Sequence, residues 1–250
     1  MKTILITGAT DGVGRVVARR LASPDTHLLV HGRDRARGTS LVEEIENAAG
    51  SAEFLPVDLA SLAEVRRLQD AVAHRPIDLL INNAGIGSAP AGRQFSEDGH
   101  ELRFAVNYLA GFLLTHLLRP ARVINVSSAG QQAIDFDDVM LTDDYSGARA
   151  YCQSKLAQIM HVFDLAIEGV HANVLHPSHY MDTNLIRQSG RTPRSTTEQG
   201  AAAILHVAAE ERRGLYFDVM REARAHEQAY NAGARRRLRE LSLRLIAEYL

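Results

Sequence analysis

Short apolar runs alternate with longer amphipathic stretches along nearly the whole chain. A run such as Leu79-Leu80-Ile81 has no polar side, which is typical of a strand buried on both faces of a sheet. Strands that alternate with helices favour one parallel sheet with right-handed crossovers and helices on both faces. The sequence therefore predicts an α/β fold with a doubly wound parallel sheet in three α/β/α layers. The predicted strands are Thr3–Thr7, His27–His31, Ala52–Val57, Asp78–Asn82, Arg122–Ser127, Ala172–His176 and Leu215–Phe217. The predicted helices are Gly14–Ala22, Asp34–Ala48, Leu62–Ala73, Glu97–Leu118, Ala148–Ile167, Thr196–Glu211 and a last one over about 222–249.

The length and the charge of the chain narrow its class. A length of 250 residues suits one large domain, and we expect residues 1–250 to form a single domain. The net charge of −2 provides no field that would attract nucleic acid or an anionic membrane. No apolar run is long enough to cross a bilayer, and residues 1–6 are too few for a signal peptide. Cys152 is the single cysteine, which excludes an intrachain disulfide. We therefore expect a cytoplasmic protein with no nucleic-acid or membrane partner.

A glycine-rich stretch, T-G-A-T-D-G-V-G, connects the first predicted strand to the first predicted helix. Gly8 permits a tight turn, Gly12 lets the backbone approach a pyrophosphate, and Gly14 lets the helix pack closely against the strand. The N-terminus of the helix would then face the phosphates of a dinucleotide. A plain glycine-rich turn is the alternative, but the strand before it and the helix after it favour the cofactor site of a Rossmann-type fold.

The end of the second predicted strand, H-G-R-D, bears on the choice of cofactor. A site that prefers NAD commonly has an acidic side chain here for the ribose 2′-hydroxyl, and this chain has His31 in that place. Arg33 follows, and its guanidinium can bind a 2′-phosphate through two hydrogen bonds. Arg15 could add a second positive group. The alternative is that both arginines are simply solvated. We predict NADP (NADPH) in preference to NAD.

Tyr151 and Lys155 are four positions apart and would share one face of a helix. Lysine is rare in this chain, since Lys2 and Lys155 are the only two among 28 Lys and Arg residues. A free tyrosine ionises far above neutral pH, and a neighbouring ammonium favours the phenolate, so Lys155 would lower the pKa of Tyr151. A compact ammonium can also donate to a ribose hydroxyl, a task that the planar fork of arginine does not fit. The alternative is an incidental pair on a solvated helix.

Together these motifs resemble those of the short-chain dehydrogenase/reductase family over about residues 3–217. Thr7-Gly8 through Gly14 is similar to the family's TGxxxGxG, Asn82-Asn83-Ala84-Gly85 to its NNAG, and Tyr151 with Lys155 to its YxxxK. The stretches A-Y-C-Q-S-K-L-A and F-x-V-N-Y-L-A-G-F-L-L-T are most similar to the retinol-dehydrogenase-like and WW-domain-oxidoreductase-like branch. Bacterial relatives in that branch are often reductases of unassigned substrate.

The resemblance implies the roles of individual residues. In this branch the catalytic serine is the second of a pair and stands farther from the tyrosine than usual, so the role passes to Ser128 rather than Ser127. The implied catalytic residues are Asn107, Ser128, Tyr151 and Lys155. The implied cofactor-binding residues are Gly8, Thr10, Asp11, Gly12, Val13, Gly14, Arg33, Asp58, Leu59, Asn83, Ala84, Gly85, Tyr151, Lys155, Pro177 and Thr183.

The segment after the sixth predicted strand departs from the family pattern. The family usually has Pro-Gly where this chain has Pro177-Ser178, and a serine has less backbone freedom than glycine. Thr183 stands one position later than the usual threonine, so an extra residue within 179–182 must bulge. His176 and His179 are three positions apart, but the sequence shows no third ligand, and we predict no metal site.

The resemblance implies an NADP-dependent oxidoreductase that interconverts a carbonyl and a primary or secondary alcohol by hydride transfer. Tyr151 would be the acid and base, Ser128 would hydrogen-bond the carbonyl oxygen, Lys155 would hold the ribose, and Asn107 would position a water. Two alternatives stay open: a non-redox lyase, isomerase or cyclase on the same scaffold, and a catalytically idle NADP-sensing regulator. The resemblance also implies a substrate lid at about 184–200. It further implies a homodimer or homotetramer formed through the helices near 97–118 and 148–167.

Overall fold

The computed structural model describes residues 1–88 and 92–250. Within these residues, eight strands form one sheet in the order β3-β2-β1-β4-β5-β6-β7-β8. The first seven strands are parallel, and β8 runs antiparallel to β7 at the edge. The predicted doubly wound α/β sheet is confirmed, and the edge strand β8 is an addition to it. The strands are β1 (Lys2–Ile6), β2 (Thr26–Gly32), β3 (Ser51–Pro56), β4 (Leu79–Asn82), β5 (Arg122–Val126), β6 (His171–His176), β7 (Tyr216–Asp218) and β8 (Arg221–Ala223).

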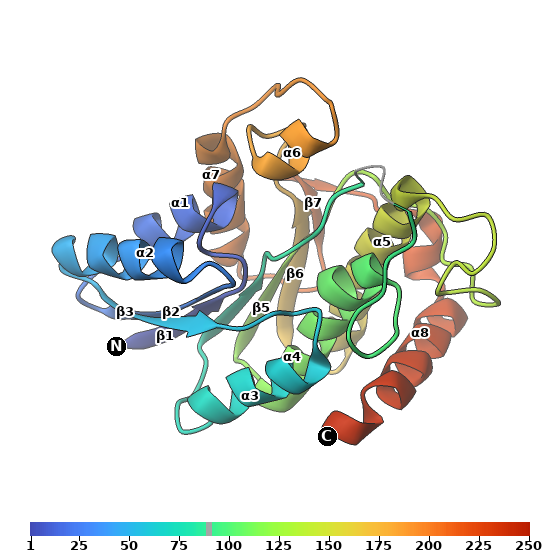
Figure 1. Ribbon diagram of the computed structural model, residues 1–250, viewed down its shortest axis with the longest axis horizontal. Helices are drawn as coiled ribbons and strands as arrows, with labels where there is room; N and C mark the ends of the chain where they lie inside the picture. Colours follow the sequence, from blue (N-terminus) through green and yellow to red (C-terminus); the bar gives the residue numbers. More distant parts are fainter. Residues whose placement is uncertain (89–91) are drawn as a thin grey trace.

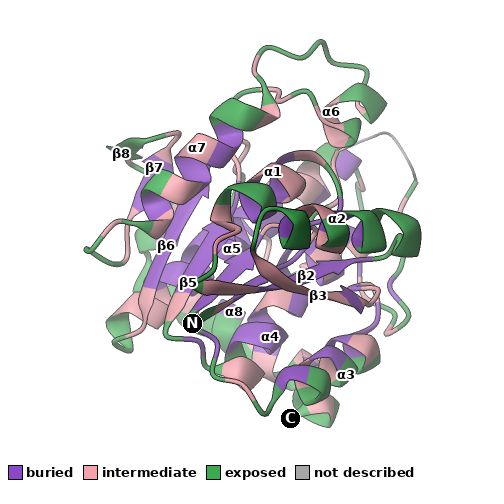
Figure 2. Ribbon diagram, turned by 90° about the vertical axis from the view of Figure 1, so that its left-hand side faces the viewer, coloured by how far each residue is buried: buried purple, intermediate pink, exposed green. Residues whose placement is uncertain are grey.

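Two apolar cores lie on opposite faces of the sheet, because successive side chains of a strand point to opposite sides. Ile4 and Ile6 belong to one core and Leu5 to the other. The helices that pack on the face of Ile4 and Ile6 are α1 (Gly12–Leu21), α2 (Arg35–Asn47) and α7 (Thr197–Ala208). Those on the face of Leu5 are α3 (Leu62–Val72), α4 (Ala110–Leu118), α5 (Gly147–Ile167) and α8 (Ala232–Leu245). Figure 1 shows the two helical layers, and Figure 2 shows the buried strands between them.

The helix predicted over 97–118 begins later than expected and with a wider turn. A π-helical segment, η1 (Phe104–Leu109), precedes α4 and contains Asn107. Wide turns of this kind occur frequently at functional sites, because they displace one residue from the regular helical register. Asn107 therefore lies in a π-helical turn and not in regular α-helix, which is consistent with a functional role.

The single helix predicted over 222–249 is wrong at its start. Residues Arg221–Ala223 form β8, a short 3-10 helix covers Glu227–Tyr230, and α8 begins only at Ala232. The side chain of Asn231 accepts the backbone N–H of Ala234 at 2.9 Å and so caps α8. Asparagine is among the preferred residues at that position, so the sequence did carry the start signal.

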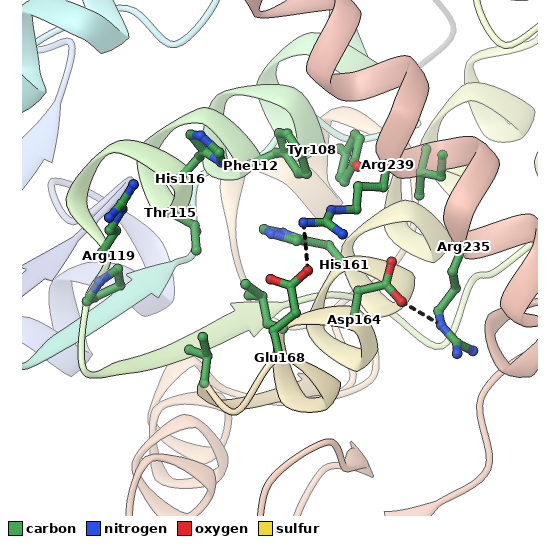
Figure 3. A pocket seen from close by; sticks show the side chains of 14 residues that line it. Tyr108, Phe112, Thr115, His116, Arg119, His161, Asp164, Glu168, Arg235 and Arg239 are labelled. Carbon is green, nitrogen blue, oxygen red and sulfur yellow. Dashed lines mark hydrogen bonds and ion pairs between the residues drawn. The ribbon is translucent and has the colours of Figure 1, made fainter. Parts of the chain in front are cut away.

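Helix α8 packs across the outer side of α4 and α5. The Tyr108 hydroxyl lies 2.7 Å from the Ser242 hydroxyl. Arg235 forms an ion pair with Asp164 of α5, and Arg239 forms one with Glu168, the residue that caps the C-terminus of α5. A pocket of about 320 Å³ remains among the three helices (Figure 3). The ion pair between Glu168 and Arg239 lies at this pocket, and the predicted catalytic residues do not line it. Because α8 occupies this side of α4 and α5, a dimer through these helices would have to include α8, and the oligomeric state stays a prediction.

Among the described helices, none has both the length and the apolar character needed to span a bilayer.

Candidate active site

The glycine-rich turn after β1 has the geometry that a pyrophosphate requires. Gly8 and Gly12 have φ angles of +64° and +52°, in the left-handed region that glycine adopts without strain. A Cβ at Gly14 would collide with the carbonyl oxygen of Gly8, so close packing also demands glycine there. Helix α1 begins at Gly12, and its first turn presents backbone N–H groups toward an incoming anion. The turn therefore fits the phosphates of a dinucleotide.

The NNAG segment after β4 holds this turn in place. The Asn83 side-chain amide donates to the carbonyl oxygens of Thr7 and Gly8, both at 3.0 Å. The Thr7 hydroxyl accepts the backbone N–H groups of Asn83 and Ala84 at 3.0 and 3.1 Å. Asn83 and Ala84, predicted to contact the cofactor, thus also fix the shape of the turn that would bind it. Thr7, which was not predicted as a site residue, is the centre of this network.

His31 has a different role from the one its position suggested. Its Nδ1 accepts the backbone N–H of Gly8 at 3.1 Å, so Nε2 carries the proton and donates to the Val57 carbonyl oxygen at 3.0 Å. Burial lowers the pKa of His31 to about 4, which keeps the ring neutral. The His31 ring therefore holds the glycine turn by a hydrogen bond to Gly8 and is not placed as a group that binds the ribose. The sequence signal for this role was a histidine placed directly after the apolar run Leu28-Leu29-Val30.

Beyond the turn, the rim where a 2′-phosphate would bind is open. Arg33 is 72% exposed, and its Nη1 lies 3.6 Å from Oδ2 of Asp58. Arg15, expected as a second positive group, instead lies against α2, where it donates to Glu44 at 2.6 Å. Leu59 is buried, so the predicted contact of Asp58-Leu59 with adenine would fall mainly to Asp58. Of the two arginines that the sequence indicated, Arg33 is the one that lies at this rim.

Helix α5 carries Tyr151 and Lys155 on successive turns. Its N-terminus is capped by Ser146, whose side chain accepts the Arg149 N–H at 3.1 Å. The Lys155 side chain is 4% exposed, and its Nζ donates to the Val126 carbonyl oxygen and to Oε1 of Gln158, both at 3.0 Å. Burial lowers the pKa of Lys155 to about 7. Gln158, one turn further along the same face, was missed as a partner of this lysine.

The two serines at the end of β5, Ser127 and Ser128, have different contacts. The Ser127 hydroxyl donates to the Lys155 carbonyl oxygen at 2.8 Å and so anchors α5 to the sheet. The Ser128 hydroxyl accepts the Gly130 N–H at 3.0 Å, and its side chain is close enough to Tyr151 to lower the pKa of that tyrosine against the effect of burial. The structure therefore brings the second serine, not the first, to the tyrosine.

In the protein without cofactor the pKa of Tyr151 is raised, and the lowering expected beside Lys155 stays a prediction for the cofactor-bound state. Part of the side chain remains accessible, but its surroundings are densely packed, and burial raises the pKa of Tyr151. The Ser128 hydroxyl opposes this rise without cancelling it. The Lys155 Nζ lies 5.7 Å from the centre of the Tyr151 ring and is itself desolvated. Lys155 alone therefore does not make the tyrosine acidic in the protein without cofactor.

Asn107 and Gly85 complete the surroundings of the lysine. The Asn107 side chain accepts the Ile86 N–H at 2.7 Å and donates to the Ile86 carbonyl oxygen at 3.1 Å and to the Ser154 hydroxyl at 2.9 Å. A Cβ on Gly85 would lie 3.3 Å from Oδ1 of Asn107 and 3.5 Å from Nζ of Lys155. The fold thus gathers all four predicted catalytic residues at the carboxyl ends of β4 and β5. The Asn107 side chain thus holds the backbone of Ile86 and connects it to Ser154 of α5.

The two departures from the family pattern after β6, Ser178 and the extra residue before Thr183, change the backbone only within this loop. Ser178 is not among the residues with positive φ, whereas Tyr180 has a φ of 44° and takes the bulge that the extra residue requires. Thr183 still reaches the phosphate turn, since a Cβ on Gly12 would lie 3.3 Å from its Cγ2. Asn184, the first residue of the short helix α6 (Asn184–Gln188), donates to Asp11 at 2.6 Å. The segment predicted as a substrate lid therefore begins in contact with the phosphate turn.

Known proteins share this arrangement. Residues 2–193 match the family model described as short chain dehydrogenase. The chain is 37% identical to polyprenol dehydrogenase of Mus musculus, over 83% of this chain and 71% of that protein. It is 33% identical to retinol dehydrogenase 13 of Homo sapiens, over 98% of this chain and 84% of that protein. A solved structure of an uncharacterised protein from Mycobacterium paratuberculosis is similar with a TM-score of 0.84 and 30% identity, over 99% of this chain and 94% of that one.

The match to the family model, the identity to these dehydrogenases and the shared fold agree with the motifs of the sequence. The chain therefore belongs to the short-chain dehydrogenase/reductase family, in its retinol-dehydrogenase-like branch, and is an NAD(P)-dependent oxidoreductase of alcohols and carbonyl compounds.

Proposed function

We propose that this protein is an NADPH-dependent carbonyl reductase in which Tyr151 is the proton donor. The observation that carries the proposal is the position of the partly exposed Tyr151, which lies beside Ser128 and one helical turn from the buried Lys155. NADPH, when bound, supplies the hydride. A carbonyl oxygen that gains negative charge next to a protonated phenol can take its proton directly.

The raised pKa of Tyr151 suits the direction of reduction. A tyrosine phenol is protonated at neutral pH and burial raises its pKa further, so Tyr151 is ready to act as an acid. Ser128 donates a second hydrogen bond to the same carbonyl oxygen and stabilises the charge that develops there. In the reverse direction Tyr151 must first lose its proton, which requires a lower pKa than the protein alone provides. Alcohol oxidation is therefore expected to need a higher pH than carbonyl reduction.

Lys155 is the residue through which the proton on Tyr151 is controlled. With a pKa of about 7, its side chain can be neutral or charged near physiological pH. Its ammonium is expected to exchange one of its two protein acceptors for a ribose hydroxyl of the bound dinucleotide. The exposed Arg33 supports NADPH over NADH, since a guanidinium at the rim binds a phosphate better than a hydroxyl.

The substrate proposed is an uncharged alcohol or its carbonyl counterpart. Relatives of this chain are named for dehydrogenation of polyprenol and retinol, and both names denote alcohols. Retinal and a long-chain enal are therefore the first members of a carbonyl panel for this protein. Non-redox chemistry and a purely nucleotide-sensing role are the alternatives, and loss of NADPH absorbance with product formation distinguishes reduction from both.

The test is Tyr151→Phe, which removes the hydroxyl and keeps the ring. Reduction rates should fall by about 10²–10⁴-fold, the usual contribution of a positioned acid. The dissociation constant for NADPH, measured by fluorescence titration, should change by less than about threefold. Tyr230→Phe, at a residue that is 42% exposed, is the matched control and should retain full activity. Turnover by Tyr151→Phe at the wild-type rate would refute the assignment.

A further inference from the structure

Three side chains converge at the carboxyl ends of β6 and β7, outside the four predicted catalytic residues. His176, His179 and Asp218 each present a ligand atom, and these atoms all lie within 4.8 Å of one another. Nε2 of His176 and Nδ1 of His179 are 3.2 Å apart. The sequence showed the two histidines but not the third group, because Asp218 is 39 positions further along the chain than His179.

The fold, not chance proximity in the sequence, assembles this cluster. His176 and Asp218 are direct partners in the parallel register of β6 and β7, so their side chains emerge on the same face. Val219 donates its N–H to the His176 carbonyl oxygen at 2.8 Å and locks that register. The left-handed Tyr180 turns the chain back, and the Ser195 hydroxyl donates to the His179 carbonyl oxygen at 2.7 Å. Strand pairing and a fixed loop therefore hold all three residues.

The carboxylate of this cluster has unmet bonding capacity. Oδ1 of Asp218 is buried and has no hydrogen-bond partner among the described residues. A buried carboxylate oxygen without a donor is costly, and native proteins usually pair such atoms with a donor or a cation. His176 is 7% exposed and faces the same point, while His179 is exposed and leaves a route from solvent. A cation between the three residues would satisfy the carboxylate.

We propose that His176, His179 and Asp218 bind one divalent transition-metal ion, with Zn²⁺ as the representative ion. Two imidazoles and one carboxylate favour first-row transition metals over Mg²⁺ and Ca²⁺, which prefer all-oxygen sites. Ligand atoms around a tetrahedral Zn²⁺ with bonds of about 2.0–2.1 Å are roughly 3.3 Å apart, close to the spacing of the two imidazole nitrogens. Because the present spacing of the three ligand atoms is at most 4.8 Å, rotation of the Asp218 side chain can bring the carboxylate to the distance that the ion requires. A water molecule would complete the four ligands.

The ion would connect a loop to the central sheet. His179 belongs to the loop that leads to Thr183 and the phosphate turn, and Asp218 belongs to the sheet. Binding would fix the loop that carries the extra residue. This proposal differs from the sequence prediction of no metal site, because strand pairing brings Asp218 to the two histidines. It does not depend on the hydride transfer proposed above.

The test is direct metal binding by the full chain after removal of any affinity tag. Calorimetric titration with Zn²⁺ should show one ion per chain, and Co²⁺ should give the visible absorption of a low-symmetry site. His179→Ala should weaken Zn²⁺ binding by roughly 100-fold or more. This variant changes an exposed side chain and should leave the fold intact, as judged by circular dichroism. His74→Ala, another exposed histidine, is the matched control and should bind as the wild type does.

Zn²⁺ binding by Asp218→Asn is a second test, which changes the carboxylate and leaves both histidines in place. The amide keeps the shape but lacks the charge, so Zn²⁺ binding should also fall, while Mg²⁺ at millimolar concentration should bind neither protein. Zn²⁺ binding of equal strength in the wild type and in His179→Ala would overturn the proposal. So would a wild-type chain that binds no Zn²⁺ or Co²⁺ at about 100 times the protein concentration.

Discussion

Two cationic side chains near the cofactor site, Lys155 and Arg33, lie in opposite environments. Lys155 is 4% exposed and donates to two acceptors of its own chain, whereas Arg33 is 72% exposed with a single carboxylate at 3.6 Å. Burial sets the pKa of the lysine, and solvent screens the charge of the arginine until a ligand arrives. A change at Lys155 should therefore alter the protein itself, and a change at Arg33 should alter only which cofactor it prefers.

The largest effect is expected from Lys155→Met, which removes the charge and retains the length of the side chain. Reduction should slow by about 100-fold or more, because the proton on Tyr151 loses its controlling neighbour. The stability of the protein should also respond to pH in a defined way. The pKa of Lys155 is lowered to about 7 in the folded chain, so at higher pH the folded state releases a proton that the unfolded state keeps. Wild-type stability should therefore rise with pH above 7, and the variant should lack this rise.

Thermal unfolding without cofactor between pH 6 and pH 9 measures this difference. The melting temperature of Lys155→Met relative to the wild type should be highest at pH 6 and should decline toward pH 9. Lys2→Met is the matched control, since Lys2 is the other lysine and is exposed, and it should leave the pH dependence unchanged. A constant difference across this range would mean that Lys155 is not desolvated, and the contrast with Arg33 would be lost.

A smaller and more selective effect is expected from Arg33→Ala. Hydrogen bonds to a charged phosphate contribute about 1.5–3 kcal/mol, so the dissociation constant for NADPH should rise by roughly 10- to 100-fold. NADH binding should change by less than about twofold, because it lacks the 2′-phosphate. Fluorescence titration of both cofactors provides the measurement, and Arg35→Ala, an exposed arginine two positions further on, is the control. Equal weakening of NADPH and NADH would remove Arg33 from the 2′-phosphate site.

Features set by neighbouring residues could be predicted from the sequence, and features set by residues far apart in the chain could not. The strand-helix alternation, the glycine turn and the Tyr151–Lys155 pair depend on residues a few positions apart, and each appears in the structure where it was expected. The support of Gly8 by His31 and the meeting of His176 with Asp218 depend on strand register, which local patterns do not specify.

The pKa of Tyr151 shows a related difference between local and distant determinants. A charge four positions away is visible in the sequence, but the packing that raises the pKa of Tyr151 in the protein without cofactor comes from the whole fold. The late start of α8 is a different kind of error, because Asn231 was available as a cap and residues 222–230 were still predicted to be helical.

The smallest effect is expected from Ser178→Gly, which restores the residue that the family usually has after the proline. Ser178 has no positive φ, so glycine gains nothing from its extra freedom there. The folded state should lose about 0.5–1 kcal/mol, because the unfolded chain becomes more flexible. Affinity for NADPH should stay within about twofold of the wild type, since the strain of the inserted residue lies at Tyr180. A large gain in NADPH affinity by Ser178→Gly would show that the serine does obstruct the cofactor. The rim of the site would then be shaped by this loop as well as by Arg33.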